Sequence, residues 1–281
     1  MIKRLFARGS RNTLTVNYIV VLVMLFFAIS PIVVMVMNSL KPPSELGLNP
    51  LGLPKNPQFL NYPTAWKNGG FATTVPNTLK LVGGTVLGIM VLGGMAAYSL
   101  AKLNLPGANI LTLYFLVQSS LPVQLFLVPL FFLWRQLGLV NTHFGLILIY
   151  IATNSAFAIF LLRSYMVQIP SDFEDAARVD GANELQVFRH VIVPITWPAF
   201  LTVGLVVGLN VWNEFLMATV FLNQPELFTV VTSYWKFSTR FGRDWGMTNA
   251  GAVMMILPIM VLFMLLQRRF IEGLTQGGVK G

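Results

Sequence analysis

The sequence contains no cysteine and only two histidines, and only 10% of its 281 residues are charged. A chain without cysteine forms no disulfide and no thiolate metal site, and it has no cysteine nucleophile. The two histidines, His143 and His190, lie far apart in the sequence, which argues against a histidine-rich metal centre. We therefore expect no bound metal and no catalytic centre in this chain, which we predict is not an enzyme.

The low charge also excludes an ordinary soluble protein, in which about 25% of residues are charged. Here 55% of residues are hydrophobic and the mean hydropathy is +0.70. The net charge of +9 is compatible with nucleic-acid binding, but the basic residues cluster at the edges of long uncharged runs, where membrane proteins carry them. We therefore predict a protein surrounded by membrane lipid, with no nucleic acid as a partner.

Six runs are long enough for a helix of roughly 20 residues, the length that crosses a bilayer. Only the fifth contains a charged residue, Glu214. The first is longer than the apolar core of a signal peptide, so we expect it to be retained. The sequence thus predicts an all-α membrane protein with one transmembrane domain over residues 1–281 and spans at about 18–37, 81–101, 110–134, 143–162, 200–222 and 245–267.

The basic residues also predict the orientation. Lys3, Arg4, Arg8 and Arg11 precede the first span, which places the N-terminus in the cytoplasm. Six spans then return the C-terminus to the same side. Two segments, 38–75 and 223–244, would lie outside, either meeting a partner there or only capping the bundle.

The segment between the fourth and fifth spans, residues 163–198, holds half of the acidic residues and would be cytoplasmic. Ser171 and Glu174 have the spacing of a capping box, which predicts a helix that starts after Pro170. Gly181 is expected to end this helix. Phe173, next to the small residues Ala176 and Ala177, is expected to anchor the helix in a groove on another protein.

A second short helix is predicted directly after the first. Asn183 and Gln186 repeat the capping signal. Leu185, Phe188 and Ile192 are at helical spacing and predict an apolar face that ends before Pro194.

The segment Glu174-Asp175-Ala176-Ala177-Arg178-Val179-Asp180-Gly181, followed by Val191-Ile192-Val193-Pro194, resembles the EAA loop of importer-type ABC transporter permeases. The spacing agrees throughout, with Asp175 in place of the motif Glu. Residues 211–216 (VWNEFL) and the C-terminal residues 267–281 are similar to the MalG-type permease of carbohydrate ABC importers.

This resemblance implies a type I ABC importer permease fold and a subunit that couples carbohydrate transport to a separate ATPase. The implied partners are a second permease subunit in a hetero-dimer, two cytoplasmic ATPase subunits and an extracytoplasmic solute-binding protein. It also implies location in a bacterial or archaeal inner membrane. The residues it assigns to ATPase coupling are Phe173, Glu174, Asp175, Ala176, Ala177, Gly181 and Pro194. Separately, the glycine-rich tail is expected to be extended and to contact the ATPase pair, because it would lie on the same side of the membrane as the EAA loop. Its residues are Gly273, Gly277, Gly278 and Gly281.

The chain has no G-x-x-x-x-G-K-[ST] phosphate loop. We therefore expect no cofactor here, and ATP and Mg²⁺ to be bound by the partner ATPase subunits.

Polar residues inside the spans are candidates for the solute pathway, because polar groups in hydrocarbon face the interior of a bundle. The alternative is that they hold the helices together by hydrogen bonds. The expected solute is an oligosaccharide. A glycerophosphate or another polyol is the alternative solute. A secondary transporter or channel is a less favoured alternative function, because it would not explain the cytoplasmic helix-Gly-helix segment. The candidate pathway residues are Gln118, Gln124, Asn154, Asn210, Asn213 and Glu214.

Overall fold

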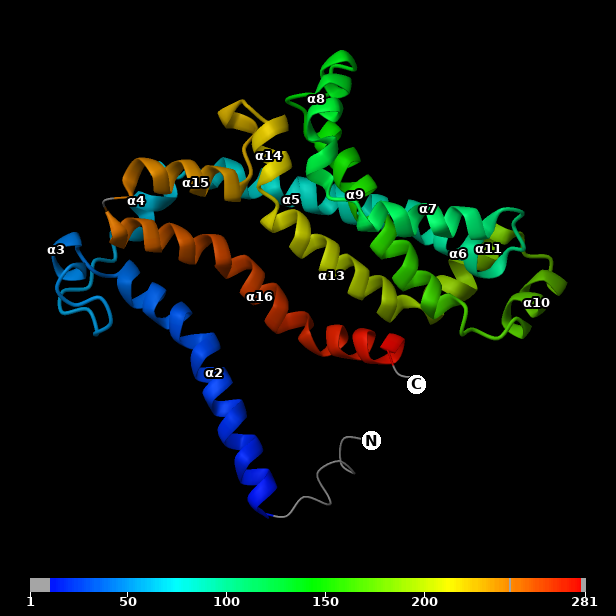
Figure 1. Ribbon diagram of the computed structural model, residues 1–281, viewed down its shortest axis with the longest axis horizontal. Helices are drawn as coiled ribbons and strands as arrows, with labels where there is room; N and C mark the ends of the chain where they lie inside the picture. The colour runs from blue at the N-terminus through cyan, green and yellow to red at the C-terminus, as the bar shows by residue number, and fades with distance from the viewer. Residues whose placement is uncertain (1–10, 243, 279–281) are drawn as a thin grey trace. The chain divides into compact units, whose positions relative to one another are not determined.

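The computed structural model describes residues 11–242 and 244–278, and within these ranges every regular element is a helix (Figure 1). The chain divides into two compact units. One comprises the described residues up to Gly69 together with Lys236–Ile256, and the other comprises Gly70–Trp235 with the described residues from Leu257 onward.

The first unit contains the first predicted span as the continuous helix α2 (Arg11–Ser39), followed by the short helices α3 (Pro43–Leu46) and α4 (Asn61–Asn68). The apolar side chains of α2 are largely exposed within the chain, as expected of a helix surrounded by lipid or by another subunit. Lys41 organises the loop after α2. Its buried ammonium donates to Asn38 Oδ1 at 2.8 Å and to the Asn49 carbonyl at 2.7 Å.

The core of the second unit is built on the second and fourth spans. The second is α5 (Phe71–Gly88), the π-helical segment η1 (Ile89–Gly93) and α6 (Gly94–Lys102), which together form one membrane-length helix. It packs along α9 (His143–Met166) and α13 (Trp197–Asn213) (Figure 1). Gly84 and Gly88 allow this approach, because a Cβ at either would collide with an isoleucine of α9.

The third predicted span is not one straight helix, so the prediction of a continuous helix over 110–134 is wrong. It consists of α7 (Ala108–Ser120), the 3₁₀ turn η2 (Val123–Phe126) and α8 (Leu127–Gln136). The chain bends by 93° between α7 and the segment formed by η2 and α8. Pro122 explains the break, since it donates no hydrogen bond and forces Leu121 into an extended conformation.

The fifth predicted span is also interrupted. Helix α13 ends at Asn213, and α14 (Leu216–Phe221) begins after a break at Glu214. The turn η4 (Pro225–Leu227) and helix α15 (Val230–Phe241) follow. The sixth predicted span lies within one continuous helix, α16 (Trp245–Gly278), which runs through Pro258 and extends beyond the predicted end at residue 267.

Candidate coupling site

The first helix of the segment between the fourth and fifth spans is α10 (Asp172–Val179), which starts where the sequence predicts. The predicted capping box does not form. Ser171 has helical backbone angles and makes no side-chain cap, and Glu174 turns inward, where its carboxylate lies 2.7 Å from Lys102 Nζ. The Glu174 side chain is only 3% exposed, and at such a site a cation satisfies a carboxylate better than one backbone amide does.

Gly181 ends this helix as predicted. Its φ of +87° is in the left-handed region, and a Cβ there would meet nothing within 4 Å. The Ala182 amide donates to the Ala177 carbonyl and the Gly181 amide donates to that of Arg178, which is the Schellman pattern.

The second helix consists of α11 (Glu184–Val187), the π-helical segment η3 (Phe188–Ile192) and α12 (Val193–Ile195). The predicted capping box of Asn183 and Gln186 is present. The predicted apolar face is partly wrong: Ile192 is buried, but Leu185 is 61% exposed and Val187 is buried instead. The i→i+5 turn of η3 changes the spacing of inward-facing positions, which a regular helical period does not anticipate.

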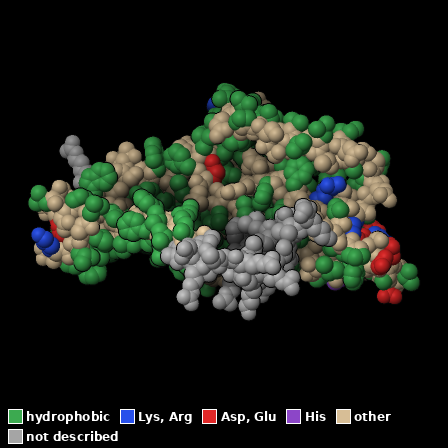
Figure 2. All heavy atoms as spheres, turned by 60° about the horizontal axis from the view of Figure 1, so that its bottom comes forward, with side chains coloured by type: hydrophobic (Ala, Val, Ile, Leu, Met, Phe, Trp, Pro, Cys, Tyr) green, Lys and Arg blue, Asp and Glu red, His purple; other side chains and the backbone are tan. Residues whose placement is uncertain are grey.

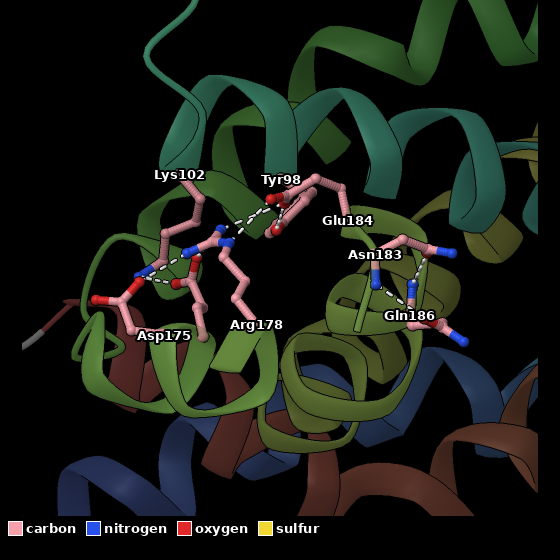
Figure 3. A network of polar contacts seen from close by, with 8 residues as sticks. Tyr98, Lys102, Asp175, Arg178, Asn183, Glu184 and Gln186 are labelled. Carbon is pink, nitrogen blue, oxygen red and sulfur yellow. Dashed lines mark hydrogen bonds and ion pairs between the residues drawn. The ribbon is translucent and has the colours of Figure 1, made fainter. Parts of the chain in front are cut away.

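Arg178 is the centre of a polar network between the two helices (Figure 3). Its guanidinium donates to Glu184 Oε1 at 2.9 Å, to Asp175 Oδ1 at 2.9 Å and to Glu174 Oε2 at 3.3 Å. The hydrogen bonds from Arg178 and then from Tyr98 lower the pKa of Glu184, and the same contact with Glu184 raises the pKa of Arg178. Both groups are therefore charged at neutral pH.

Two residues of this network, Tyr98 and Lys102, were not predicted from the sequence. Both lie in α6, at the end of the second span, far from the loop in the sequence. The Tyr98 hydroxyl donates to Glu184 Oε2 at 2.6 Å, and Lys102 pairs with Glu174. The only sequence signal was a lysine at the edge of an apolar run, which also marks an ordinary membrane boundary.

The outer side of α10 carries exposed side chains. Phe173 is 55% exposed, and Asp175 and Ala176 also face outward. Phe173 and Ile195 border a cavity of about 350 Å³ that the end of α9 and the residues around Pro170 complete. Figure 2 shows acidic and basic side chains next to one another on the side where Figure 1 places α10.

Glu214 occupies the break in the fifth span. Its carboxylate accepts hydrogen bonds from the amides of Met217 at 2.8 Å and Ala218 at 2.9 Å, and from the Tyr150 hydroxyl at 2.6 Å. The carboxylate thus accepts hydrogen bonds from backbone amides in the first turn of α14, which have no partner within the helix. The positive end of the helix dipole at this position favours a negatively charged group.

The other pathway candidates lie in different surroundings. Asn210 of α13 donates to Asn154 of α9 at 3.3 Å, and Asn213 lies on the exposed side of α13. Gln118 instead joins α7 to α9, since its amide donates to the Ala152 carbonyl at 2.6 Å, and Gln124 is exposed in η2. The structure therefore brings Asn154 and Asn210 together and places Gln118 in a helix contact.

The tail is not extended where the structure describes it. Gly273, Gly277 and Gly278 belong to α16, so the expectation of an extended chain there is wrong. The neighbouring helical turns outweigh the weak helix preference of glycine. Gly281 lies outside the described residues. Within the described ranges no group of three His, Asp or Glu residues is placed to hold a metal ion.

Comparison with known proteins shows the family. Residues 89–276 match the family model described as binding-protein-dependent transport system inner membrane component. The arabinooligosaccharides transport system permease protein AraQ of Bacillus subtilis is 36% identical over 89% of this chain and 90% of its own length. The trehalose transport system permease protein SugB of Mycobacterium tuberculosis is 35% identical over 91% of this chain and 93% of its own.

A solved structure agrees with these relatives. A chain of a bacterial ABC transporter involved in the import of the acidic polysaccharide alginate superposes with a TM-score of 0.80 and 25% identity, over 94% of this chain and 99% of that chain.

Proposed function

Because the chain belongs to the family of binding-protein-dependent transport system inner membrane components, we propose that it is the permease subunit of an ATP-driven importer and forms half of a membrane pathway for a carbohydrate. The observation that carries this proposal is the coupling site. A stiff helix, a glycine turn and a second helix, fixed on their inner side by ion pairs, leave Phe173 and Asp175 exposed.

The expected partners follow from this geometry and from the family. The exposed side of α10 suits a groove on a cytoplasmic ATPase subunit, with Phe173 as the apolar anchor and Asp175 beside it. Two such ATPase subunits would bind ATP and Mg²⁺, and their hydrolysis of ATP would supply the energy. A second permease subunit would complete the pathway, and an extracytoplasmic binding protein would deliver the solute. We further propose that the end of α16 and the tail from Gly273 contact the ATPase pair.

The polar side chains of α9 and α13 favour a neutral, hydroxyl-rich solute. Asn154, Asn210 and Asn213 are amides, which both donate to and accept from hydroxyl groups. A glycerophosphate would need a cation for its phosphate, and neither 143–162 nor 200–222 contains lysine or arginine. An oligosaccharide is therefore the proposed solute class, with a glycerophosphate less favoured.

Reconstitution tests this function. The chain, its partner permease and the two ATPase subunits are incorporated into lipid vesicles with the cognate binding protein, whose sugar is first identified by calorimetry. We expect uptake of that sugar only with ATP, and none when the ATPase subunits are left out. Solute flux by this chain alone, insensitive to ATP, would instead indicate a channel or secondary transporter.

A further inference from the structure

The last turns of α6 are bound to the coupling segment at three places. Lys102 pairs with Glu174 and also donates to the Ile169 carbonyl at 2.6 Å, just before α10. Tyr98 donates to Glu184 at the start of α11. In addition, Arg163 Nε at the end of α9 donates to the Leu100 carbonyl at 3.2 Å. The second span is thus tied to a segment that the chain itself connects only to the fourth and fifth spans.

The central ion pair is buried, which distinguishes it from a surface pair of little consequence. The side chains of Lys102 and Glu174 are 9% and 3% exposed. Separating two such charges without water or new partners is costly, so the pair holds its geometry when the neighbouring helices move.

Two π-helical segments border the helices that this network joins. Segment η1 (Ile89–Gly93) directly precedes α6, and η3 (Phe188–Ile192) directly follows α11. The Tyr98 ring contacts the Phe188 ring at a centroid distance of 5.4 Å. A π-helical turn interrupts the regular hydrogen-bond pattern of an α-helix, and helices commonly bend at such turns.

We propose that Lys102 and Tyr98 are positioning residues that make α6, α10 and α11 move as one body, bordered by η1 and η3. Motion of the ATPase subunits then reaches the second span directly, in addition to the fourth and fifth. This inference rests on the function proposed above and adds a route for its coupling.

Because the chain has no cysteine, a pair of new thiols gives a direct test. The variant Lys102→Cys with Glu174→Cys removes both charges together, so neither is left buried alone. In the reconstituted complex we expect ATP hydrolysis to persist while sugar taken up per ATP falls about tenfold, a typical size for coupling between sites. A reducible bifunctional reagent that spans the distance once filled by the two side chains should bridge the thiols and restore uptake per ATP. Reduction of the bridge should return uptake per ATP to the lower value of the unbridged variant.

Four single variants separate this role from general stability. Lys102→Arg keeps the charge and both donor contacts and should retain coupling. Lys80→Met removes an exposed lysine of the same span and should change nothing, whereas Lys102→Met should lower uptake per ATP. If the double-cysteine variant does not copurify with the ATPase subunits, Tyr98→Phe tests the proposal in its place. This variant removes only the hydroxyl and should also lower uptake per ATP.

The inference is overturned if the unbridged double-cysteine variant, or Tyr98→Phe when that variant does not assemble, keeps normal uptake per ATP. It is also overturned if bridging blocks transport instead of restoring it. Failure of the proposed function looks different, because the unsubstituted complex would then show no ATP-dependent sugar uptake at all.

Discussion

At the scale of single residues, the turn at Gly181 depends on backbone conformation alone. Its φ of +87° is strained for any residue with a side chain, yet the surrounding space is open. A larger residue therefore costs conformational energy without a steric clash, about 1 to 2 kcal/mol for the left-handed region. This cost is too small to unfold a membrane bundle and large enough to displace a docked helix.

Gly181→Val should therefore leave membrane insertion intact, weaken association with the ATPase subunits and abolish transport. Gly138→Val is a matched control, since Gly138 has a φ of +68° and the same open space but lies between α8 and α9, outside the coupling site. Expression, copurified ATPase and uptake are measured for both variants. Normal transport by Gly181→Val at normal expression would remove the coupling role from this segment.

At the scale of elements, the break in the fifth span depends on Glu214. Its carboxylate accepts from two amides at the start of α14 and from Tyr150, so its contacts are those of a residue that stabilises a helix break. A pathway role was also predicted for Glu214. The two roles have different experimental consequences.

Glu214→Leu should lower the thermal stability of the purified complex, because it leaves two amides and a hydroxyl without their acceptor, and hydrogen bonds to charged groups contribute about 1.5 to 3 kcal/mol each. Tyr150→Phe removes only one donor and should cost less. The KM for sugar uptake should change little in Tyr150→Phe. A Glu214→Gln variant with normal stability but a strongly raised KM would favour the pathway role instead.

At the scale of the whole molecule, the chain is a multi-pass membrane protein, and its charge distribution predicts which side of the membrane each end faces. Within the residues that the structure describes, four helices are long and apolar enough to span a membrane, and two bent pairs of helices bring the number to six if each pair is one span. An even number of crossings leaves both ends on one side, and the basic residues before the first span favour the cytoplasm.

A reporter enzyme that is active only in the cytoplasm should therefore be active when fused after Gly281 or before Met1. A reporter that is active only in the periplasm should be inactive at both positions. A reporter placed in the loop between α3 and α4 serves as the opposite control and should be active only outside. Activity of the C-terminal fusion in the periplasm would contradict the six-span arrangement.

Much of this protein was determined by its sequence alone. Uncharged runs of membrane length specify spans because a bilayer tolerates few charges. Asn183 and Gln186 specify a capping box, and Gly181 specifies the turn that ends α10, both through short-range interactions. Both are present as predicted. The segment from Glu174 to Pro194, together with residues 211–216 and the C-terminal residues 267–281, was also enough to identify the family.

The tertiary structure determined those side-chain contacts that depend on residues far apart in the sequence. Ser171 and Glu174 have the spacing of a cap, but the ammonium of Lys102, brought close by packing of α6 on α9, took the carboxylate instead. Leu185 lost its place in the core because a π-helical turn changed the spacing of the inward side. In the sequence, Glu214 is an isolated charge within a span. In the structure the helix is interrupted there, and the carboxylate accepts hydrogen bonds from three donors. In each case a partner far along the chain or a local change of helix type outweighed the sequence pattern, and neither can be read from spacing alone.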